Sequence, residues 1–473
     1  MPLAGSFPAR FPLLEKGPPM TDPVLTRRGF LGTLAAGAAV SLAGCGSGPS
    51  SESSDPGELT TIVIWDRAGA HAKARQEFFR VWNEREGKSR GIAVRYEPQA
   101  TDKYEEIVRL GFQTKRAPDL FHSPSAQLGA FVAAGWVRPL PDLVGKAVLD
   151  KAAPYHQKNS ELVWGGVPYA VPTTAFTNRM VINVDLFEKA GLDPGAPPAT
   201  FSEVRRAAAA ITKAGGGDAF GMLIPIKATG FRQWSVDIPL MAGDAALAQF
   251  GLFNAATQTY ESAKYAPLLE LYRAMITDKT AYPGAATLAA DVAINAFGKG
   301  EAGMYITSSA IVSSLADLSS KVKAIAAPLP VPDGQKLVRS PMNAGYPYAI
   351  SSTSQNPEKA AAVFEVMVGD AVQQALAAKA APPLNGAVWD SAVIKDNALL
   401  QQFRPGELDR QWPKTPGGLL QVDGESVDQT VEKLLLDPSA ALEPALSGLQ
   451  QRMQAAYDAA VQRGDVDPQE FRA

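Results

Sequence analysis

Residues 60–65, TTIVIW, form a β-branched run that ends at Asp66 and opens an alternating series of strand and helix patterns. A short apolar run of this kind is typical of a buried parallel strand. An apolar stripe at helical spacing then predicts a helix over His71–Glu86, and Ile92–Glu97 and Pro118–His122 are predicted as further strands. Alternation of strands and helices predicts a parallel sheet with right-handed crossovers.

The same order of elements restarts after Pro172, which predicts a second lobe with its own sheet. Thr200-x-x-Glu203 is a capping box, and Thr307–Ser309 are predicted to cap another helix. The remaining predicted elements are a helix with a capping-box-like start at Asp102, strands over 175–183, 220–224 and 302–306, an extended segment over 343–351, helices over 200–214 and 262–276 and from Asn356, and a helical tail over 426–462.

Residues 26–45, TRRGFLGTLAAGAAVSLAGC, predict an export signal. Arg27 and Arg28 give it the twin-arginine form, and the end of the stretch, LAGC, is typical of a lipoprotein cleavage box. The apolar run is shorter than the roughly 20 residues that span a bilayer, and the alternative is a buried core helix. We expect the mature chain to begin at a lipid-modified Cys45, followed by a flexible tether over residues 45–57, while the start codon, Met1 or Met20, stays open.

The composition is that of a globular chain, with 46% hydrophobic and 20% charged residues and a formal net charge of −3. It therefore lacks the basic character of a nucleic-acid-binding protein. The single cysteine excludes an internal disulfide, and the spacing of His71, His122 and His156 does not predict a zinc site. We predict no metal and no cofactor, and we interpret the histidines as surface or hydrogen-bonded polar residues.

Several segments, in family order, resemble the carbohydrate-binding extracellular solute-binding proteins of bacterial ABC importers, the group that includes maltose-binding protein. The likeness extends over most of residues 58–380, and its motifs are specific to the family but not to one sugar. The segments are GIAV (91–94), APDL (117–120), AGWVRPL (134–140), GVPYAVP (166–172) leading to Asn178, DLFEKAGL (185–192), PPATFSE (197–203) and AFGKGEAGM (296–304).

This resemblance implies an α/β, two-lobed periplasmic-binding-protein-like fold of type II, with the ligand cleft between the lobes and a helical C-terminal tail. The implied division is a signal peptide over 1–44, the tether over 45–57, an N-terminal lobe over 58–171 plus 349–404, a C-terminal lobe over 172–345 plus 412–473, and hinges near 168–173, 343–348 and 403–411. We call these hinges the first, second and third crossings.

The resemblance also implies a function without catalysis, and so no catalytic residues. The chain is expected to be a monomer, anchored by lipid on Cys45 at the outer face of the cell membrane. It is expected to capture a mono- or oligosaccharide by closing its lobes and to deliver it to the transmembrane subunits of an ABC permease.

Ligands of such sheets lie beyond the carboxyl ends of the strands, so residues that follow strands and hinges are the candidate ligand contacts. Aromatic rings would stack on sugar C–H faces, and charged groups would bond to hydroxyls. Trp65 and Tyr348 have an equal alternative as core residues, and no acidic residue follows the first crossing as it does in some family members. The candidates are Trp65, Asp66, Arg67, Ser123, Ser125, Thr173, Thr174, Phe231, Trp234, Ser308, Ser309, Tyr346 and Tyr348.

Two other classes of function stay open at the level of sequence. The same fold binds polyamine, ferric or phosphate-type ligands in other receptors, and Tyr346 with Tyr348 keeps a ferric site open. An exported glycan-active enzyme is the second alternative. Ser320-x-x-Lys323 matches one motif of penicillin-binding proteins, but no Lys-Thr-Gly follows it, because Lys414-Thr415-Pro416 stands there.

Overall fold

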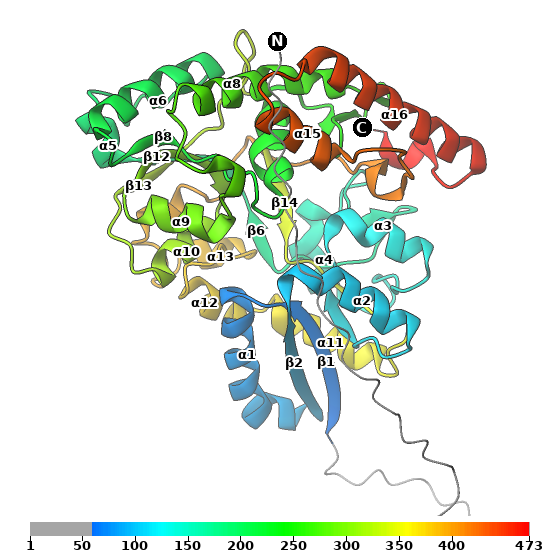
Figure 1. Ribbon diagram of the computed structural model, residues 1–473. Helices are drawn as coiled ribbons and strands as arrows, with labels where there is room; N and C mark the ends of the chain where they lie inside the picture. Colours follow the sequence, from blue (N-terminus) through cyan, green and yellow to red (C-terminus); the bar gives the residue numbers. More distant parts are fainter. Residues whose placement is uncertain (1–58, 473) are drawn as a thin grey trace, which may run out of the picture. The chain divides into compact units, whose positions relative to one another are not determined.

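The computed structural model describes residues 59–472, all of which belong to one compact unit (Figure 1). The predicted export signal, Cys45 and the tether lie outside the described residues, so the lipid anchor stays a prediction. In residues 59–472, no single helix is long and apolar enough to cross a membrane. Helices α11 (Pro357–Met367) and α12 (Asp370–Ala377) meet that criterion only as a pair, bent by 51° at their junction.

The first lobe is built on a four-stranded sheet of order β15-β3-β1-β2. Strand β1 (Thr60–Arg67) lies parallel to β2 (Ile92–Gln99) and to β3 (Leu120–His122), while β15 (Tyr348–Ile350) runs antiparallel to β3. One apolar core contains Ile62 and Ile64 of β1, and a separate core contains Phe121 of β3. The first lobe therefore has two apolar cores built on one sheet.

The second lobe has its own four-stranded sheet, of order β13-β7-β12-β8. Strand β12 (Ala302–Ser308) pairs in parallel with β8 (Phe220–Met222) and antiparallel with β7 (Asn178–Asn183), which also pairs with β13 (Ala324–Ala327). In Figure 1, helices α6 and α8 cover this sheet on one side and α9 and α10 lie on the other. The two-lobed α/β fold predicted from the sequence is confirmed.

A third sheet has three strands, in the order β16-β14-β6. Strand β14 (Ser340–Gly345) pairs antiparallel with β6 (Thr174–Phe176) and in parallel with β16 (Asp409–Gln411). Its strands adjoin or contain the three predicted crossings. The residue bounds of the lobes and hinges themselves stay a prediction.

Several element predictions need correction. The strand predicted over 175–183 is two strands, because at Thr177 the chain leaves the central sheet for the second-lobe sheet, and the Thr177 hydroxyl donates to the carbonyl of Phe403 at 2.6 Å. Ser309 precedes α10 (Ala310–Asp317) without capping it, since its hydroxyl faces the carbonyl of Ala175 at 3.4 Å.

Other boundaries shift by smaller amounts. Helix α2 (Tyr104–Gln113) begins after a short 3-10 turn, and the extended segment over 343–351 is interrupted at Tyr346, whose φ is 43°. The tail is two helices, α15 (Val427–Leu436) and α16 (Leu442–Arg463). The other elements are α1 Ala70–Trp82, α3 Ser125–Ala133, α4 Lys146–Ala152, β4 Val163–Trp164, β5 Val167–Pro168, α5 Val184–Lys189, α6 Phe201–Gly215, α7 Ile238–Gly243, β9 Leu247–Ala248, β10 Phe253–Asn254, β11 Thr259–Tyr260, α8 Ala266–Thr277, α9 Ala290–Gly298, α13 Gly386–Trp389 and α14 Ala398–Gln401.

Candidate ligand cleft

A cavity of about 640 Å³ is lined by residues of both lobes and of the second crossing. Its volume is within the range of sites that hold small molecules. The first lobe contributes the last residue of β1, residues at and after the end of β3 and residues of α2, and the second lobe contributes the segment before α7. The lining residues discussed below are Arg67, Glu105, Arg109, His122, Ser125, Gln127, Phe176, Arg232, Trp234, Phe250, Asn343, Tyr346, Trp412 and Asp428.

Helix α2 fixes the strand ends at this cavity. The hydroxyl of Tyr104, at the start of α2, donates to the carbonyls of Trp65 at 3.1 Å and His122 at 2.8 Å. Tyr104 is fully buried, and burial raises the pKa of its phenol well above the usual value. One neutral hydroxyl therefore ties together the ends of β1 and β3, next to the residues that line the cavity.

Four of the residues predicted as ligand contacts line this cavity: Arg67, Ser125, Trp234 and Tyr346. They come from the end of β1, the start of α3, the segment before α7 and the second crossing. The fold thus brings four predicted residues to one cavity, although the first and last of them, Arg67 and Tyr346, are 279 positions apart in the chain.

The other predicted contacts are absent from the lining. Trp65 packs against α2 and donates from its ring nitrogen to Glu97 at 2.8 Å, and Phe231 packs into the second-lobe core. The alternative interpretation of Trp65 as a packing residue fits this placement. The remaining residues are buried beside the cleft, within the crossings or at the end of β12, and they are Asp66, Ser123, Thr173, Thr174, Ser308, Ser309 and Tyr348.

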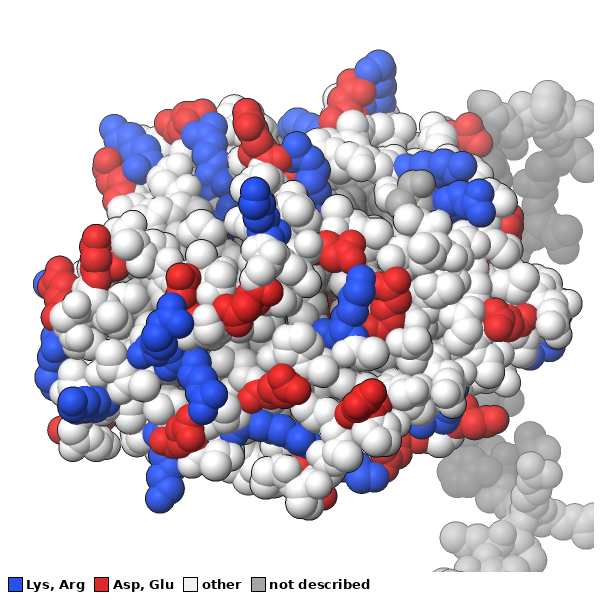
Figure 2. Space-filling view, turned by 90° about the horizontal axis from the view of Figure 1, so that it is seen from above, with Lys and Arg blue, Asp and Glu red and all other residues white. Residues whose placement is uncertain are grey.

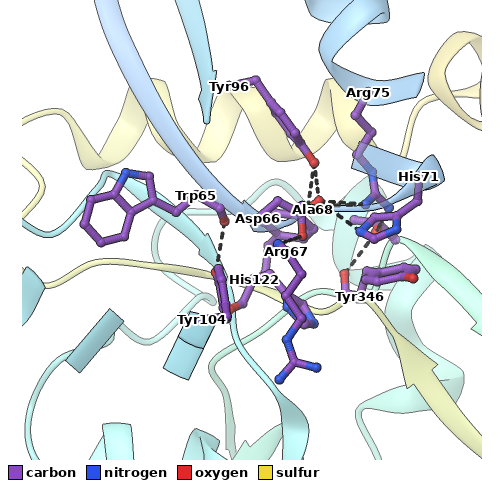
Figure 3. Close-up of polar contacts among 12 residues, drawn as sticks. Trp65, Asp66, Arg67, Ala68, His71, Arg75, Tyr96, Tyr104, His122 and Tyr346 are labelled. Atoms are coloured by element: carbon purple, nitrogen blue, oxygen red, sulfur yellow. Dashed lines mark hydrogen bonds and ion pairs between the residues drawn. The ribbon is translucent and has the colours of Figure 1, made fainter. Parts of the chain in front are cut away.

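Asp66 is the centre of a buried polar cluster at the end of β1 (Figure 3). Its carboxylate accepts hydrogen bonds from the Tyr96 hydroxyl and from Arg75, whose nearest nitrogen lies 3.4 Å away, and His71 lies at the same distance. Burial opposes ionisation, but His71 and Arg75 hold the pKa of Asp66 well below its usual range. Asp66 therefore stays ionised and organises its surroundings.

Charged groups around the cavity are largely paired with opposite charges. Arg67 contacts Glu105 at 3.0 Å, and Arg232 contacts Asp428 at 3.0 Å and also the buried Asp237. With the Asp66–Arg75 pair and Arg109 included, four guanidinium groups and four carboxylates lie at or beside the cavity. The arrangement favours a ligand without net charge.

Polar atoms without a hydrogen-bond partner also occur in the lining. They include both donors and acceptors: Nε of Arg67, Nδ1 of His122, Oε1 of Gln127 and Oδ1 of Asn343 have none among the described residues. His122 and Asn343 are only 5% and 9% exposed. Buried polar groups are normally paired, so this set is suited to a ligand that both donates and accepts hydrogen bonds.

Aromatic rings give the same cavity an apolar surface. Trp234 and Trp412 lie with their ring centroids 6.2 Å apart in an edge arrangement, and Tyr346, Phe176 and Phe250 also line the cavity. Apolar faces of this kind, next to unpaired donors and acceptors, are typical of sites for amphipathic ligands.

Sequence reasoning missed His122, Gln127 and Asn343. The prediction that the histidines are surface or hydrogen-bonded residues is wrong for His122, because it is buried and its Nδ1 is unpaired. Burial lowers the pKa of His122 to about 3, so its ring is neutral. His122 directly precedes the predicted Ser123 at the end of β3, and the strand-end rule that selected Ser123 would also have found it.

Comparison with known proteins agrees with this architecture. The chain is 27% identical over 286 residues to a putative binding protein of Brucella abortus, and it spans 64% of the length of that relative. The GacH receptor of Streptomyces glaucescens, solved unliganded and with acarbose, superimposes with a TM-score of 0.64 at 18% identity and covers 84% of this chain and 98% of its own. The sugar-binding protein MalE of Xanthomonas citri gives 0.65 at 19% identity, with 86% and 100% coverage.

The family model of the bacterial extracellular solute-binding proteins matches residues 68–374, more than half of the chain. That range begins directly after β1 and includes β2, β3 and β15, the whole second-lobe sheet, and the cavity residues from His122 to Tyr346. The chain belongs to the family of bacterial extracellular solute-binding proteins.

Proposed function

We propose that this protein is the lipid-anchored binding subunit of an ABC importer, and that it captures an uncharged mono- or oligosaccharide between its lobes for delivery to the permease. The observation that carries the proposal is the cavity lining, where unpaired donors and acceptors face aromatic rings. A sugar ring has both surfaces, since its hydroxyls donate and accept while its C–H groups are apolar. Structurally similar proteins solved with acarbose, tagatose or raffinose support the choice.

Non-sugar ligands fit the lining less well. A polyamine calls for an excess of carboxylates and a phosphate for an excess of cations, whereas the charges at and beside this cavity balance. A ferric site calls for two phenolates, but Tyr348 is absent from the lining, and its hydroxyl is bonded to Arg75 and Tyr96. Burial raises the pKa of Tyr348 well above its usual value, which opposes phenolate formation.

The Ser320-x-x-Lys323 motif has structural contacts that disfavour an enzyme of the penicillin-binding type. The Ser320 hydroxyl donates to the carbonyl of Gly298 at 2.6 Å, and Lys323 pairs with Asp185 at 3.1 Å. Neither group is directed at the other, as a nucleophile and its base must be.

A thermal-shift screen against a broad sugar panel tests the saccharide assignment. The form that starts after Cys45 should melt at a higher temperature with a bound sugar, by an amount that grows with RT ln(1 + [L]/Kd). Spermidine, phosphate and ferric citrate serve as matched non-sugar ligands. A shift with one of these and with no sugar would replace the saccharide by that ligand class.

A separate experiment tests the anchor. Cys45→Ser removes the sulfur that would carry the lipid, so we expect the full chain to move from the membrane to the soluble fraction on cell fractionation. Sugar binding should be unchanged, because residues 57–473 form their own compact unit. Membrane association that persists in this variant would contradict the lipid anchor.

A further inference from the structure

Tyr346 has an unusual backbone for a residue that lines a binding cavity. Its φ of 43° lies in the left-handed region, which residues other than glycine seldom adopt, and the following residue is Pro347, which further restricts its backbone. Strained residues of this kind persist only where surrounding contacts hold them, and they cluster at functional sites. The contacts that hold Tyr346 therefore bear on the ligand site.

The backbone of Tyr346 is held by a relay from a buried charge. The Thr173 hydroxyl donates to the carbonyl of Tyr346 at 2.9 Å and accepts a hydrogen bond from the Arg75 guanidinium. Thr173 lies in the first crossing and Tyr346 in the second, so a single hydroxyl joins both predicted hinges. Arg75 and Thr173 are both fully buried, which removes competition from water.

The ring of Tyr346 is held by the same region of the first lobe. His71 stacks on it with ring centroids 3.7 Å apart and an interplanar angle of 21° (Figure 3), and the Arg75 guanidinium carbon lies 5.3 Å from the ring centroid. Arg75 is itself fixed by Asp66 and by the Tyr348 hydroxyl at 3.2 Å. The ring and the carbonyl of one cavity residue thus both depend on Arg75.

Resting on the proposed function, we infer that Arg75 and Thr173 are positioning residues for ligand binding: their hydrogen bond holds Tyr346 in the left-handed conformation that places it at the cavity. Neither Arg75 nor Thr173 lines the cavity; both contact Tyr346, which does. Their effect on affinity passes through Tyr346, and it is present before any ligand binds.

Thr173→Val tests the inference, because valine keeps the branched shape but removes the hydroxyl that joins Arg75 to Tyr346. The neighbouring Thr174→Val is a matched control, since Thr174 is equally buried and its hydroxyl has no partner among the described residues. We expect hydrogen exchange in the ligand-free protein to become faster over residues 343–350 in Thr173→Val, and unchanged in Thr174→Val. Equal exchange in both variants would overturn the inference.

The binding readout uses the panel saccharide with the largest thermal shift, titrated calorimetrically. We expect Thr173→Val to weaken the affinity for this saccharide about tenfold, which is the usual consequence of losing a hydrogen bond to a charged group. Thr174→Val should change the affinity less than twofold. In a Tyr346→Ala background the Thr173→Val effect should disappear, because the two residues act in series. A merely structural role would instead lower the melting temperature and leave the two losses additive.

Arg75→Lys provides a second variant if Thr173→Val folds poorly. Lysine keeps the positive charge beside Asp66 but lacks the planar fork that reaches several partners at once. Faster exchange over 343–350 is again the expected result, and unchanged exchange would contradict the inference. Because this readout needs no ligand, failure of the whole sugar panel would remove the proposed function and leave the test of the relay intact.

Discussion

At the scale of single residues, His122 links the cavity to acid sensitivity. Burial, assisted by nearby Arg67, His71 and Arg75, lowers the pKa of His122 to about 3, whereas an unfolded histidine has a pKa of about 6.5. Between these values the unfolded chain holds a proton that the folded chain does not. The contribution of His122 to stability is therefore complete above about pH 6.5 and decreases as the pH falls towards 3.

His122→Gln should remove this dependence. We expect the difference in unfolding free energy between the variant and the unmodified protein to change with pH by at most about 1.4 kcal/mol per unit between pH 4.5 and 6.5, and to become constant above pH 7. Urea unfolding at five pH values measures it. Two parallel curves would show that His122 is protonated equally in the folded and unfolded states.

The candidate site shows what residue types in sequence can and cannot indicate. Arg67, Ser125, Trp234 and Tyr346 were predicted because each follows a strand or lies at a hinge, and all four line the cavity. Asp66 was predicted by the same rule, yet it is buried beside the cavity and does not line it. Successive strand residues face opposite sides, so a neighbour of a cavity residue is often turned away from it.

At the scale of elements, the capping box of α6 offers a direct test of local sequence logic. Thr200 accepts from the backbone of Glu203, whose carboxylate accepts in return from the backbone of Thr200 at 3.2 Å, as the sequence predicts. Thr200→Ala should lower the unfolding free energy by about 1 kcal/mol, and Thr200→Ser should retain most of it. Denaturant titration of the three proteins measures both; equal losses in both variants would exclude a capping role.

Element prediction succeeds where the signal is local and fails where tertiary contacts decide. The capping box of Thr200 and Glu203 involves only residues at the helix start, and the predicted start of α6 is correct. Ser309 has the right residue type for a cap, but its hydroxyl faces the carbonyl of Ala175 in a strand 134 positions away. Similarly, one strand is predicted over 175–183, and the pairing of its two halves with different sheets divides it at Thr177.

At the scale of the whole folded unit, the predicted lobes contact each other outside the cavity. The β4–β5 hairpin, in the predicted first lobe, meets the C-terminal turn Pro468–Phe471 of the predicted second lobe. Trp164 of the hairpin packs against cores of both lobes. Charged side chains exposed on the face shown in Figure 2 are of both signs and interspersed, whereas this contact contains one buried cation.

That cation is Lys414, which closes the contact. Its ammonium donates to the carbonyl of Val163 at 2.7 Å, lies 4.6 Å from the Trp164 ring centroid and pairs with the carboxylate of Glu470. The same carboxylate accepts from the backbone N–H of Gly165 at 3.0 Å. Any opening of the lobes that separates the hairpin from the C-terminal turn must break these bonds.

Glu470→Gln should therefore shift the ligand-free protein towards open conformations. The amide leaves Lys414 without its counter-charge in a buried position, which weakens the contact in the closed state only. We expect a larger radius of gyration by small-angle scattering without sugar and an unchanged one with saturating sugar. The apparent dissociation constant should rise in proportion to the lost closed fraction.

Glu425→Gln is the matched control for this prediction. Glu425 pairs with Lys433 at 2.8 Å in an exposed position within the C-terminal region, so its loss removes an exposed Lys–Glu ion pair without touching the hairpin. It should alter neither the scattering profile nor the affinity, because exposed pairs contribute about 1 kcal/mol or less. If both variants give the profile of the unmodified protein, the bonds of Glu470 do not limit opening, and the three crossings alone set the balance between open and closed forms.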